Sequence, residues 1–323
     1  MRPPTSRSWW PTPAGSTSPR APTRARSTRP RTGSRASSGH NRAVRLLLGL
    51  LIAVSASLVV PAPAEAAADL PPLTQVQASS YDGKRKYGRT LEVDPGAWSP
   101  APERIGYQWL RDGVPIPGEV GRRYRIAPAD VGHRLDVAIV VGATGYADTA
   151  TQLPVGRIKH RVGVRRTVRY SVRVRGHVGG ADVGEFRRLA QETYDDARGW
   201  RARGVRFKRV RHGGAFTLWL AQARQVPGFS GACSAQWSCR VGRNVVINVD
   251  RWRGASPAWI RAGASLRDYR HMVVNHETGH WLGYGHASCP RRGALAPVMM
   301  QQSKGTGGCR LNPWPTEREL GRR

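Results

Sequence analysis

The segment HETGHWLGYGH, which begins at His276, carries three histidines and a glutamate at spacings that suit a metal site. On a helix, His276 and His280 are four residues apart and face the same side, so both imidazoles can bind one zinc ion. Glu277 then lies beside them as a general base for a zinc-activated water. Gly283 permits the left-handed turn that lets His286 return as third ligand. Three protein ligands leave one position open, which is typical of catalytic zinc.

The residues before this segment predict the helix that must carry it. Ser265 is a suitable N-cap, and Asp268 stands at the third helical position of a partial capping box. His271 precedes His276 by five residues, about 140° around the helix, and we interpret it as a bystander. The apolar side chains recur near the helical period and predict one buried face: Leu266, Tyr269, Val273, Val274 and Trp281.

The extended histidine string resembles that of the metzincin metallopeptidases. Those enzymes place a methionine turn beneath the metal, and Met299, with Met300 as the other candidate, stands at a fitting distance. Several metzincins carry a tyrosine two residues after this methionine, where it stabilises the oxyanion. Gln301 or Gln302 occupies that place here, so the oxyanion-stabilising group is unassigned.

A wider likeness covers roughly residues 165–315. The segments VVNHETGHWLGYGHASCP and APVMMQQSKGTGGCRLNPWP resemble a family of secreted actinobacterial proteins of unknown function that are regarded as zinc peptidases. The resemblance implies an α+β metzincin-like domain with a mixed sheet, a zinc-binding active-site helix and one catalytic Zn²⁺.

Composition sets limits on partners and on domain number. The 323 residues carry a net charge of +31, but only five of the 52 basic residues are lysine, and arginine-rich composition can reflect GC-rich codons. No helix-turn-helix, zinc-finger or aromatic RNA-binding motif accompanies the charge, which argues against a nucleic-acid partner. Attraction to an anionic cell-wall polymer or membrane surface is a weaker hypothesis. The length accommodates two domains.

The N-terminal sequence predicts export. Residues 1–45 form a basic arm rich in Arg, Pro and Ser, which we expect to be disordered. Residues 46–66 read as the apolar and cleavage regions of a signal peptide cut near Ala66; membrane anchoring by residues 46–60 is the alternative. If translation starts at Val44 from a GTG codon, the arm is not translated, and the gene sequence tests this.

Four cysteines follow the export signal, and an even number in an exported chain indicates disulfides. Three pairings are possible. We favour the two local ones, Cys233–Cys239 and Cys289–Cys309, and the second would tie the chain after His286 to the chain after Met299. A cysteine metal site fits these spacings badly.

The remaining chain divides into two regions. Residues 70–155 alternate in polarity between Gly, Pro and Asp turns and resemble a bacterial immunoglobulin-like β-sandwich, with Trp109 as core aromatic and without the paired cysteines of antibody domains. Residues 156–166 read as a basic linker. The catalytic region, 167–323, should open with a strand at 167–174. A helix follows from Asp182, with Glu185 completing its capping pattern. Further strands are expected at 205–210, 216–221 and 245–249.

These patterns together predict a secreted zinc metallopeptidase that cleaves peptide or protein substrates. Glu277 would accept a proton from the zinc-activated water and return it to the leaving amine. The alternatives are a non-catalytic zinc protein that binds the cell surface or wall, and a hydrolase of a non-peptide amide.

Overall fold

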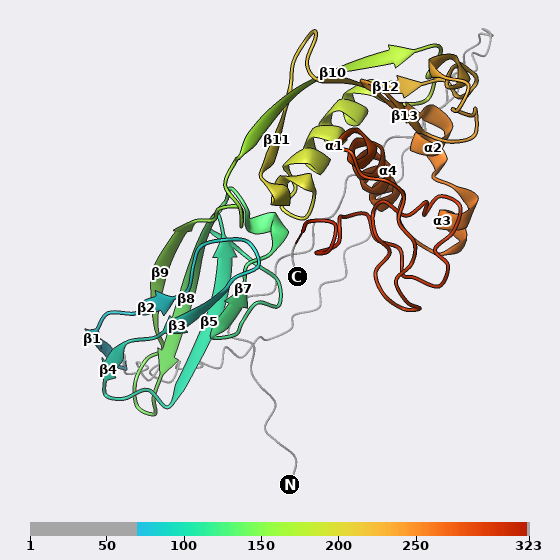
Figure 1. Ribbon diagram of the computed structural model, residues 1–323. Helices are drawn as coiled ribbons and strands as arrows, with labels where there is room; N and C mark the ends of the chain where they lie inside the picture. The colour runs from blue at the N-terminus through green and yellow to red at the C-terminus, as the bar shows by residue number, and fades with distance from the viewer. Residues whose placement is uncertain (1–69, 322–323) are drawn as a thin grey trace, which may run out of the picture. The chain divides into compact units, whose positions relative to one another are not determined.

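The computed structural model describes residues 70–321 (Figure 1). The expected basic arm, signal peptide and cleavage site at residues 1–66 lie outside the described residues. Within the part of the chain that is described, every helix is too short or too polar to cross a bilayer. The described chain is a mixed α+β structure, in which an all-β region precedes a region of helices and one larger sheet.

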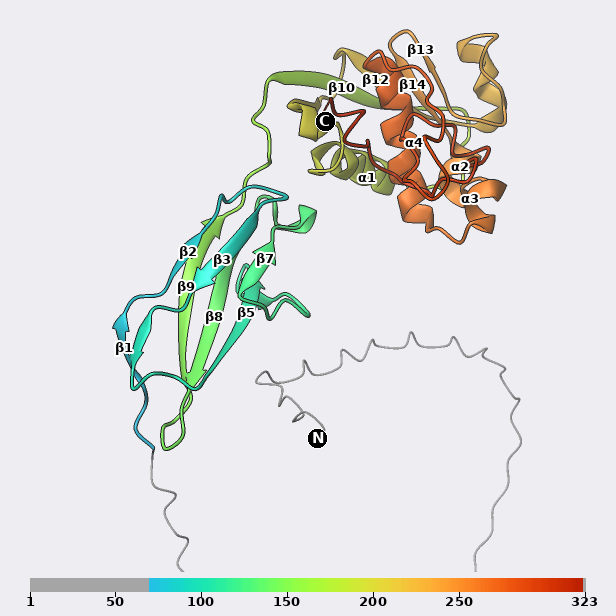
Figure 2. The same ribbon diagram turned by 60° about the horizontal axis from the view of Figure 1, so that its bottom comes forward.

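The first region consists of short strands that pair antiparallel (Figure 2). They form sheets in the orders β1-β4, β2-β3-β7 and β6-β5-β8-β9. The strands are β1 (Thr74–Gln77), β2 (Ser80–Asp82), β3 (Thr90–Asp94), β4 (Ala97–Ser99), β5 (Arg104–Arg111), β6 (Val114–Pro115), β7 (Arg123–Arg125), β8 (Arg134–Gly142) and β9 (Thr149–Arg157), and the 3-10 helix η1 spans Pro128–Asp130.

One hydrophobic core joins the two larger sheets of this region. Alternate residues of β8 point inward, as the period of two predicts, and they pack with Leu91 and Val93 of β3. Trp109 is fully buried and stacks on Tyr124 with ring centroids 5.1 Å apart, which confirms it as the core aromatic. The last strand, β9, reaches Arg157, and the next strand begins at Arg166.

The second region is built on a five-stranded sheet in the order β11-β10-β12-β14-β13. All neighbours are parallel except the edge strand β13, which runs antiparallel to β14. The elements are β10 (Arg166–Arg175), α1 (Val183–Asp195), η2 (Trp200–Arg203), β11 (Val205–Arg209), β12 (Phe216–Ala221), η3 (Ala223–Gln225), η4 (Pro227–Phe229), β13 (Cys239–Val241), β14 (Asn244–Asn248), α2 (Val249–Gly254), α3 (Pro257–Arg261) and α4 (Leu266–Trp281).

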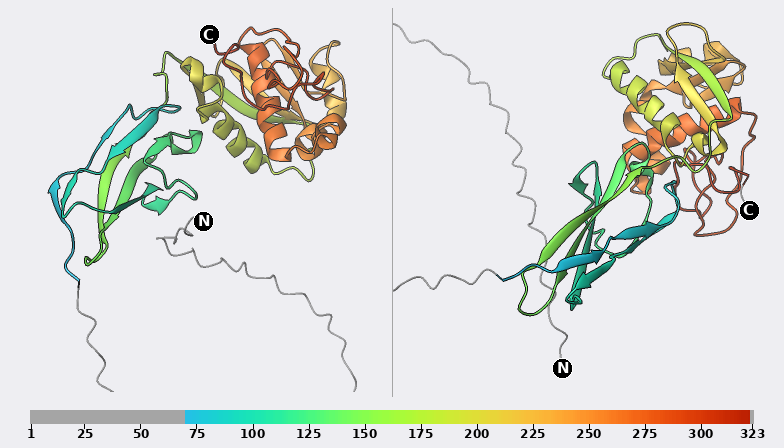
Figure 3. Two further views of the ribbon diagram at one scale, coloured as in Figure 1. Left: turned by 90° about the horizontal axis from the view of Figure 1, so that it is seen from below. Right: turned by 90° about the vertical axis from the view of Figure 1, so that its left-hand side faces the viewer.

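Helices α1 and α4 contact each other and pack on one face of this sheet (Figures 1 and 3). Successive residues of β14 divide between the two faces: Val245 and Ile247 join the core beneath the helices, whereas Val246 joins a smaller cluster on the opposite face. The chain after α4 has no further named helix or strand in the described residues.

The N-terminus of α1 differs in part from the expected capping pattern. Asp182 is the N-cap and accepts a hydrogen bond from Gly184 N at 2.7 Å, as predicted. Glu185 does not complete a capping box; its carboxylate forms an ion pair with Arg270 of α4 at 2.8 Å. The expected capping bond is absent because the ion pair between the two packed helices competes for the Glu185 carboxylate.

Helix α4 begins where the sequence predicts. Ser265 is the N-cap, and its hydroxyl accepts a hydrogen bond from Asp268 N at 3.0 Å. The middle of the helix is buried on all sides, because the sheet and α1 cover part of it and the chain after His286 covers the rest. Gly283 follows the helix with φ +97°, a left-handed conformation that glycine adopts at little cost.

Candidate metal centre

Three imidazole nitrogens meet at the C-terminal end of α4. His280 Nε2 lies 3.1 Å from His276 Nε2 and 3.1 Å from His286 Nε2. Within the described residues, these three form the one group of at least three potential ligands whose atoms lie within 4.8 Å of one another. The helix supplies His276 and His280, and the turn at Gly283 returns His286 to them, as the spacing predicts.

Hydrogen bonds on the other ring nitrogens orient two of these rings. His276 Nδ1 lies 2.8 Å from Val298 O, and His280 Nδ1 lies 2.8 Å from Tyr284 O. A carbonyl oxygen can only accept, so each Nδ1 carries the proton and each Nε2 presents a lone pair. Adjacent lone pairs repel unless a cation or proton lies between them.

The trio therefore fits a tetrahedral zinc ion. Zinc about 2.0–2.1 Å from each nitrogen would place neighbouring nitrogens about 3.3–3.4 Å apart, close to the observed contacts. Burial, the largest cause, lowers the pKa of His276 to about 3, and burial also lowers the pKa of His280 and of His286. All three imidazoles are consequently neutral near pH 7, which is the form that binds metal.

Glu277 lies beside the trio in the wall of the same cavity, which has a volume of about 600 Å³. Burial raises the pKa of its carboxyl group to about 8. Among the described residues no side chain forms an ion pair with this carboxyl group. A buried carboxyl group that faces a cavity next to three imidazoles is suited to exchange a proton with a bound molecule.

Met299 packs beneath helix α4, against Gly279. It is 1% exposed, whereas Met300 is partly exposed. The close approach requires a glycine in the helix, because a Cβ on Gly279 would lie 2.2 Å from Met299 Sδ and 2.8 Å from Trp200 Cζ2. Sulfur thus occupies the space next to the backbone that carries His280.

The turn that contains Met299 is held by Glu319, a residue that the sequence analysis missed. The Glu319 carboxylate accepts hydrogen bonds from Val298 N at 3.0 Å and from Met299 N at 2.8 Å. It also accepts bonds from the backbone N–H and the hydroxyl of Thr316 at 2.7 and 2.8 Å. The T-x-x-E pattern of residues 316–319 is a capping-box signature, which predicts the bonds between Thr316 and Glu319 but not those to Val298 and Met299.

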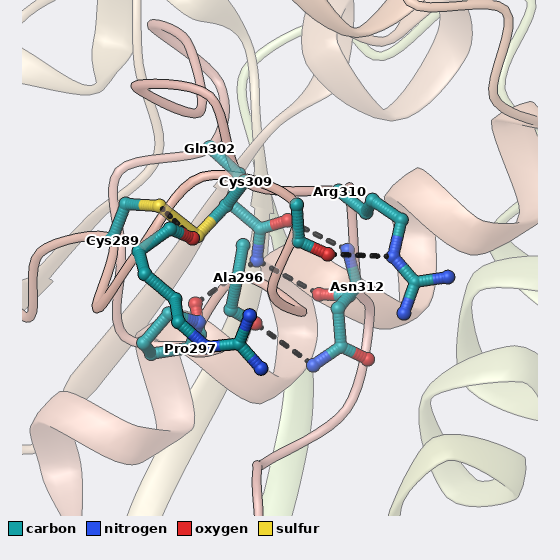
Figure 4. Close-up of a disulfide and its surroundings, with 9 residues drawn as sticks. Cys289, Ala296, Pro297, Gln302, Cys309, Arg310 and Asn312 are labelled. Carbon is teal, nitrogen blue, oxygen red and sulfur yellow. Dashed lines mark hydrogen bonds between the residues drawn. A yellow bond between two sulfur atoms is a disulfide. The ribbon is translucent and has the colours of Figure 1, made fainter.

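Both expected local disulfides are present, Cys233–Cys239 and Cys289–Cys309. Figure 4 shows the second one beside a network around Gln302 and Asn312. Gln302 Nε2 donates to Pro297 O at 3.1 Å and to Asn312 O at 2.8 Å, while its Oε1 accepts from Asn312 N at 2.9 Å. These bonds occupy the Gln302 amide and make it a support of the loop, whereas Gln301 is exposed at the cavity.

The remaining cavity wall includes two basic residues to which no role was assigned from the sequence. The loop closed by Cys233–Cys239 forms one side together with Arg240 of β13, and Lys304 lies in the loop after Met300. Their place depends on the pairing of β13 with β14 and on the path of an irregular loop. His271 lies elsewhere: its Nδ1 is 2.8 Å from Thr193 Oγ1, and its ring packs against Trp314.

Of two comparisons with known proteins, one assigns the chain to a family. No curated protein matches it. A family described as "Protein of unknown function (DUF3152)" matches residues 140–316, a segment that includes the histidine trio, Glu277, Met299 and the four cysteines and ends before Glu319. Because the match covers more than half of the 323 residues, the chain belongs to the DUF3152 family.

Proposed function

We propose that this protein is a secreted zinc-dependent peptidase. The observation that carries the proposal is the convergence of His276, His280 and His286 on one point beside the buried carboxyl group of Glu277. Two ligands come from adjacent turns of a rigid helix and the third follows a left-handed glycine. Three ligands leave room for a reacting molecule, and the cavity of about 600 Å³ can receive several residues of a peptide.

Each residue has a defined role in this proposal. A bound zinc ion would supply Lewis acidity, which polarises a carbonyl group and makes water more acidic. His276 and His280 offer neutral Nε2 atoms because Val298 O and Tyr284 O hold their Nδ1 protons. Glu277 accepts a proton from the attacking water and delivers it to the leaving amine. A nearby cation favours the carboxylate form of Glu277, which opposes the effect of burial on its pKa.

We further propose that residues 167–323 have a metzincin-like fold. Three features support this: the histidine string on α4, Met299 packed beneath it, and the antiparallel edge strand β13 at the cavity. Residues 70–155 are proposed to be an immunoglobulin-like sandwich that acts as a spacer or adhesive module. Its support is the pair of antiparallel sheets that share a core around Trp109.

The two disulfides indicate an oxidising, extracellular environment. Secretion through a signal peptide cleaved near Ala66 agrees with them and is part of the proposal. N-terminal sequencing of the protein recovered from culture medium tests it, since a chain that stays with the membrane would favour anchoring by residues 46–60.

The decisive experiment compares the wild-type protein with Glu277→Gln. Both should bind one zinc ion per chain by elemental analysis, because Glu277 is not a ligand in the proposal. Only the wild type should cleave a peptide library, with the variant slower by at least about 100-fold, the usual loss of a general base. Equal cleavage by both proteins would contradict the role of Glu277. Full zinc occupancy without cleavage of any peptide would favour a binding protein or a hydrolase of another amide.

A further inference from the structure

Arg240 lies on the helix-covered face of the sheet, at the wall of the cavity. In the pairing of β13 with β14 it stands opposite Val245, and directly opposed residues point to the same face. Val245 belongs to the core beneath α4, whereas Cys239 and Val241, the neighbours of Arg240, pack in the cluster on the other face. The side chain of Arg240 on β13 thus points toward the cavity.

This guanidinium is incompletely satisfied. Arg240 Nε is shielded from solvent and has no hydrogen-bond partner, and within the described residues no carboxylate forms an ion pair with Arg240. Buried unpaired donors cost free energy and are uncommon. The described chain has two other such atoms, Trp252 Nε1 and Asn275 Oδ1, and neither of those residues lines the cavity. Of these three residues only Arg240 lines the cavity, where the rest of its partly exposed side chain can meet a bound molecule.

The charges around the cavity define what that molecule should carry. Among the described residues that line it, Arg240 and Lys304 are the two permanent cations and Glu277 is the one acidic residue. A divalent ion held by the three histidines, as in the proposed function, would make the cavity more positive. An arginine offers a planar fork of donors that matches the two oxygens of a carboxylate.

We propose that Arg240 binds a carboxylate of the substrate and gives the cavity a preference for acidic peptides. This inference rests on the proposed peptidase function, and the carboxylate can belong to an Asp or Glu side chain or to the C-terminus of the substrate. Arg240 is a specificity-determining residue in this proposal, with no part in proton transfer.

Binding to the zinc-loaded Glu277→Gln protein tests the proposal without turnover. The probes are fluorescent peptides that carry Glu or Gln at one position, moved stepwise along an alanine-rich sequence, each as a free acid and as an amide. We expect at least one Glu peptide, or the free acid over its amide, to bind about tenfold or more tightly than its neutral match. A difference in affinity between Glu and Gln peptides would identify a side-chain carboxylate, and a difference between free acid and amide would identify the C-terminal carboxylate.

Adding Arg240→Gln should remove that difference, and Arg240→Glu should favour peptides with Lys. The matched control is Arg243→Gln, which removes the same charge from the exposed end of the same hairpin, outside the cavity lining, and should keep the preference. Zinc content and the unfolding midpoint verify that each variant is folded. The proposal would be overturned if the Glu277→Gln protein binds Glu and Gln peptides with equal affinity at every position, and also binds each free acid and its amide with equal affinity.

Kinetics in the wild-type background separate this inference from the function it rests on. Arg240→Gln should lower kcat/KM for acidic peptides through a higher KM, and should lower it less for their neutral matches. An equal fall in kcat for acidic and neutral peptides would place Arg240 at the oxyanion and refute a recognition role. If no peptide is cleaved but Arg240-dependent binding of carboxylates is observed, the recognition site stands and the peptidase function fails.

Discussion

Replacing Glu319 by glutamine should loosen the proposed metal centre although Glu319 touches none of the three histidines. Its carboxylate accepts the N–H groups of Val298 and Met299. The carbonyl groups of the same two residues hold the histidine string: Val298 O accepts from His276 Nδ1 at 2.8 Å, and Met299 O accepts from Ala287 N, next to His286, at 3.1 Å. One carboxylate thus fixes the turn on which both ends of the histidine string depend.

The magnitude follows from what glutamine can no longer accept. The amide keeps one oxygen, and its NH₂ group faces a backbone N–H instead of accepting from it. A hydrogen bond to a charged group contributes about 1.5–3 kcal/mol, and the lower half of that range applies because Glu319 is only partly buried. We expect Glu319→Gln to lower the free energy of unfolding by about 1.5–2 kcal/mol. Zinc affinity should fall about tenfold, as for other supports of ligating histidines.

Urea unfolding and zinc competition against a chromophoric chelator measure the two effects. Glu317→Gln is the matched control, because Glu317 is exposed and its ion pair with Arg161, at 3.7 Å, should contribute little. If Glu319→Gln and Glu317→Gln give the same unfolding free energy and the same zinc affinity, the turn does not depend on Glu319 and the reasoning is wrong.

Two further predictions concern residues that pack around α4. Gly279→Ala should destabilise the zinc-loaded protein by about 1–3 kcal/mol in urea unfolding, because its Cβ would overlap Met299; full stability would mean that Met299 can move away. Burial lowers the pKa of His271, so the unfolded state binds its proton first as the pH falls below about 6.5. The free energy of unfolding should therefore decrease as the pH falls below about 6.5, by up to about 1.4 kcal/mol per pH unit. Unfolding curves of His271→Gln should show a smaller decrease than those of the wild type.

Features that depend on residues close together in the sequence were predictable. The helix that carries His276 begins at Ser265, as its capping residues indicated, and β12 spans the predicted residues 216–221. Met299 is the buried methionine of its turn, and the cysteines pair with their nearer partners. In each case the spacing or the capping chemistry of a short segment is sufficient to define the structure.

Features that depend on pairing over long distances were not predictable. The alternation of strands does not reveal that β10, β11, β12 and β14 run parallel, because strand direction depends on long connections such as the one from β10 through α1 to β11. Arg240 faces the cavity only through the register of β13 on β14, and a shift by one residue would turn it to the other face. Glu185 illustrates the reverse case, in which a tertiary ion pair replaced a bond that local sequence favoured.

His286, the proposed third zinc ligand, needs supports that secondary structure cannot supply. His286 follows the last helix, and the described chain beyond it forms no further named helix or strand, so few regular backbone bonds restrain it. The Cys289–Cys309 disulfide closes a loop of about twenty residues around Met299. By reducing the conformational entropy of the unfolded chain, it stabilises the folded state by about 3 kcal/mol. Gln302, Asn312 and Glu319 then bond the backbone inside and beside that loop. Because these supports converge on the turn that contacts both His276 and the neighbour of His286, the geometry of the trio depends on the irregular C-terminal chain as much as on α4.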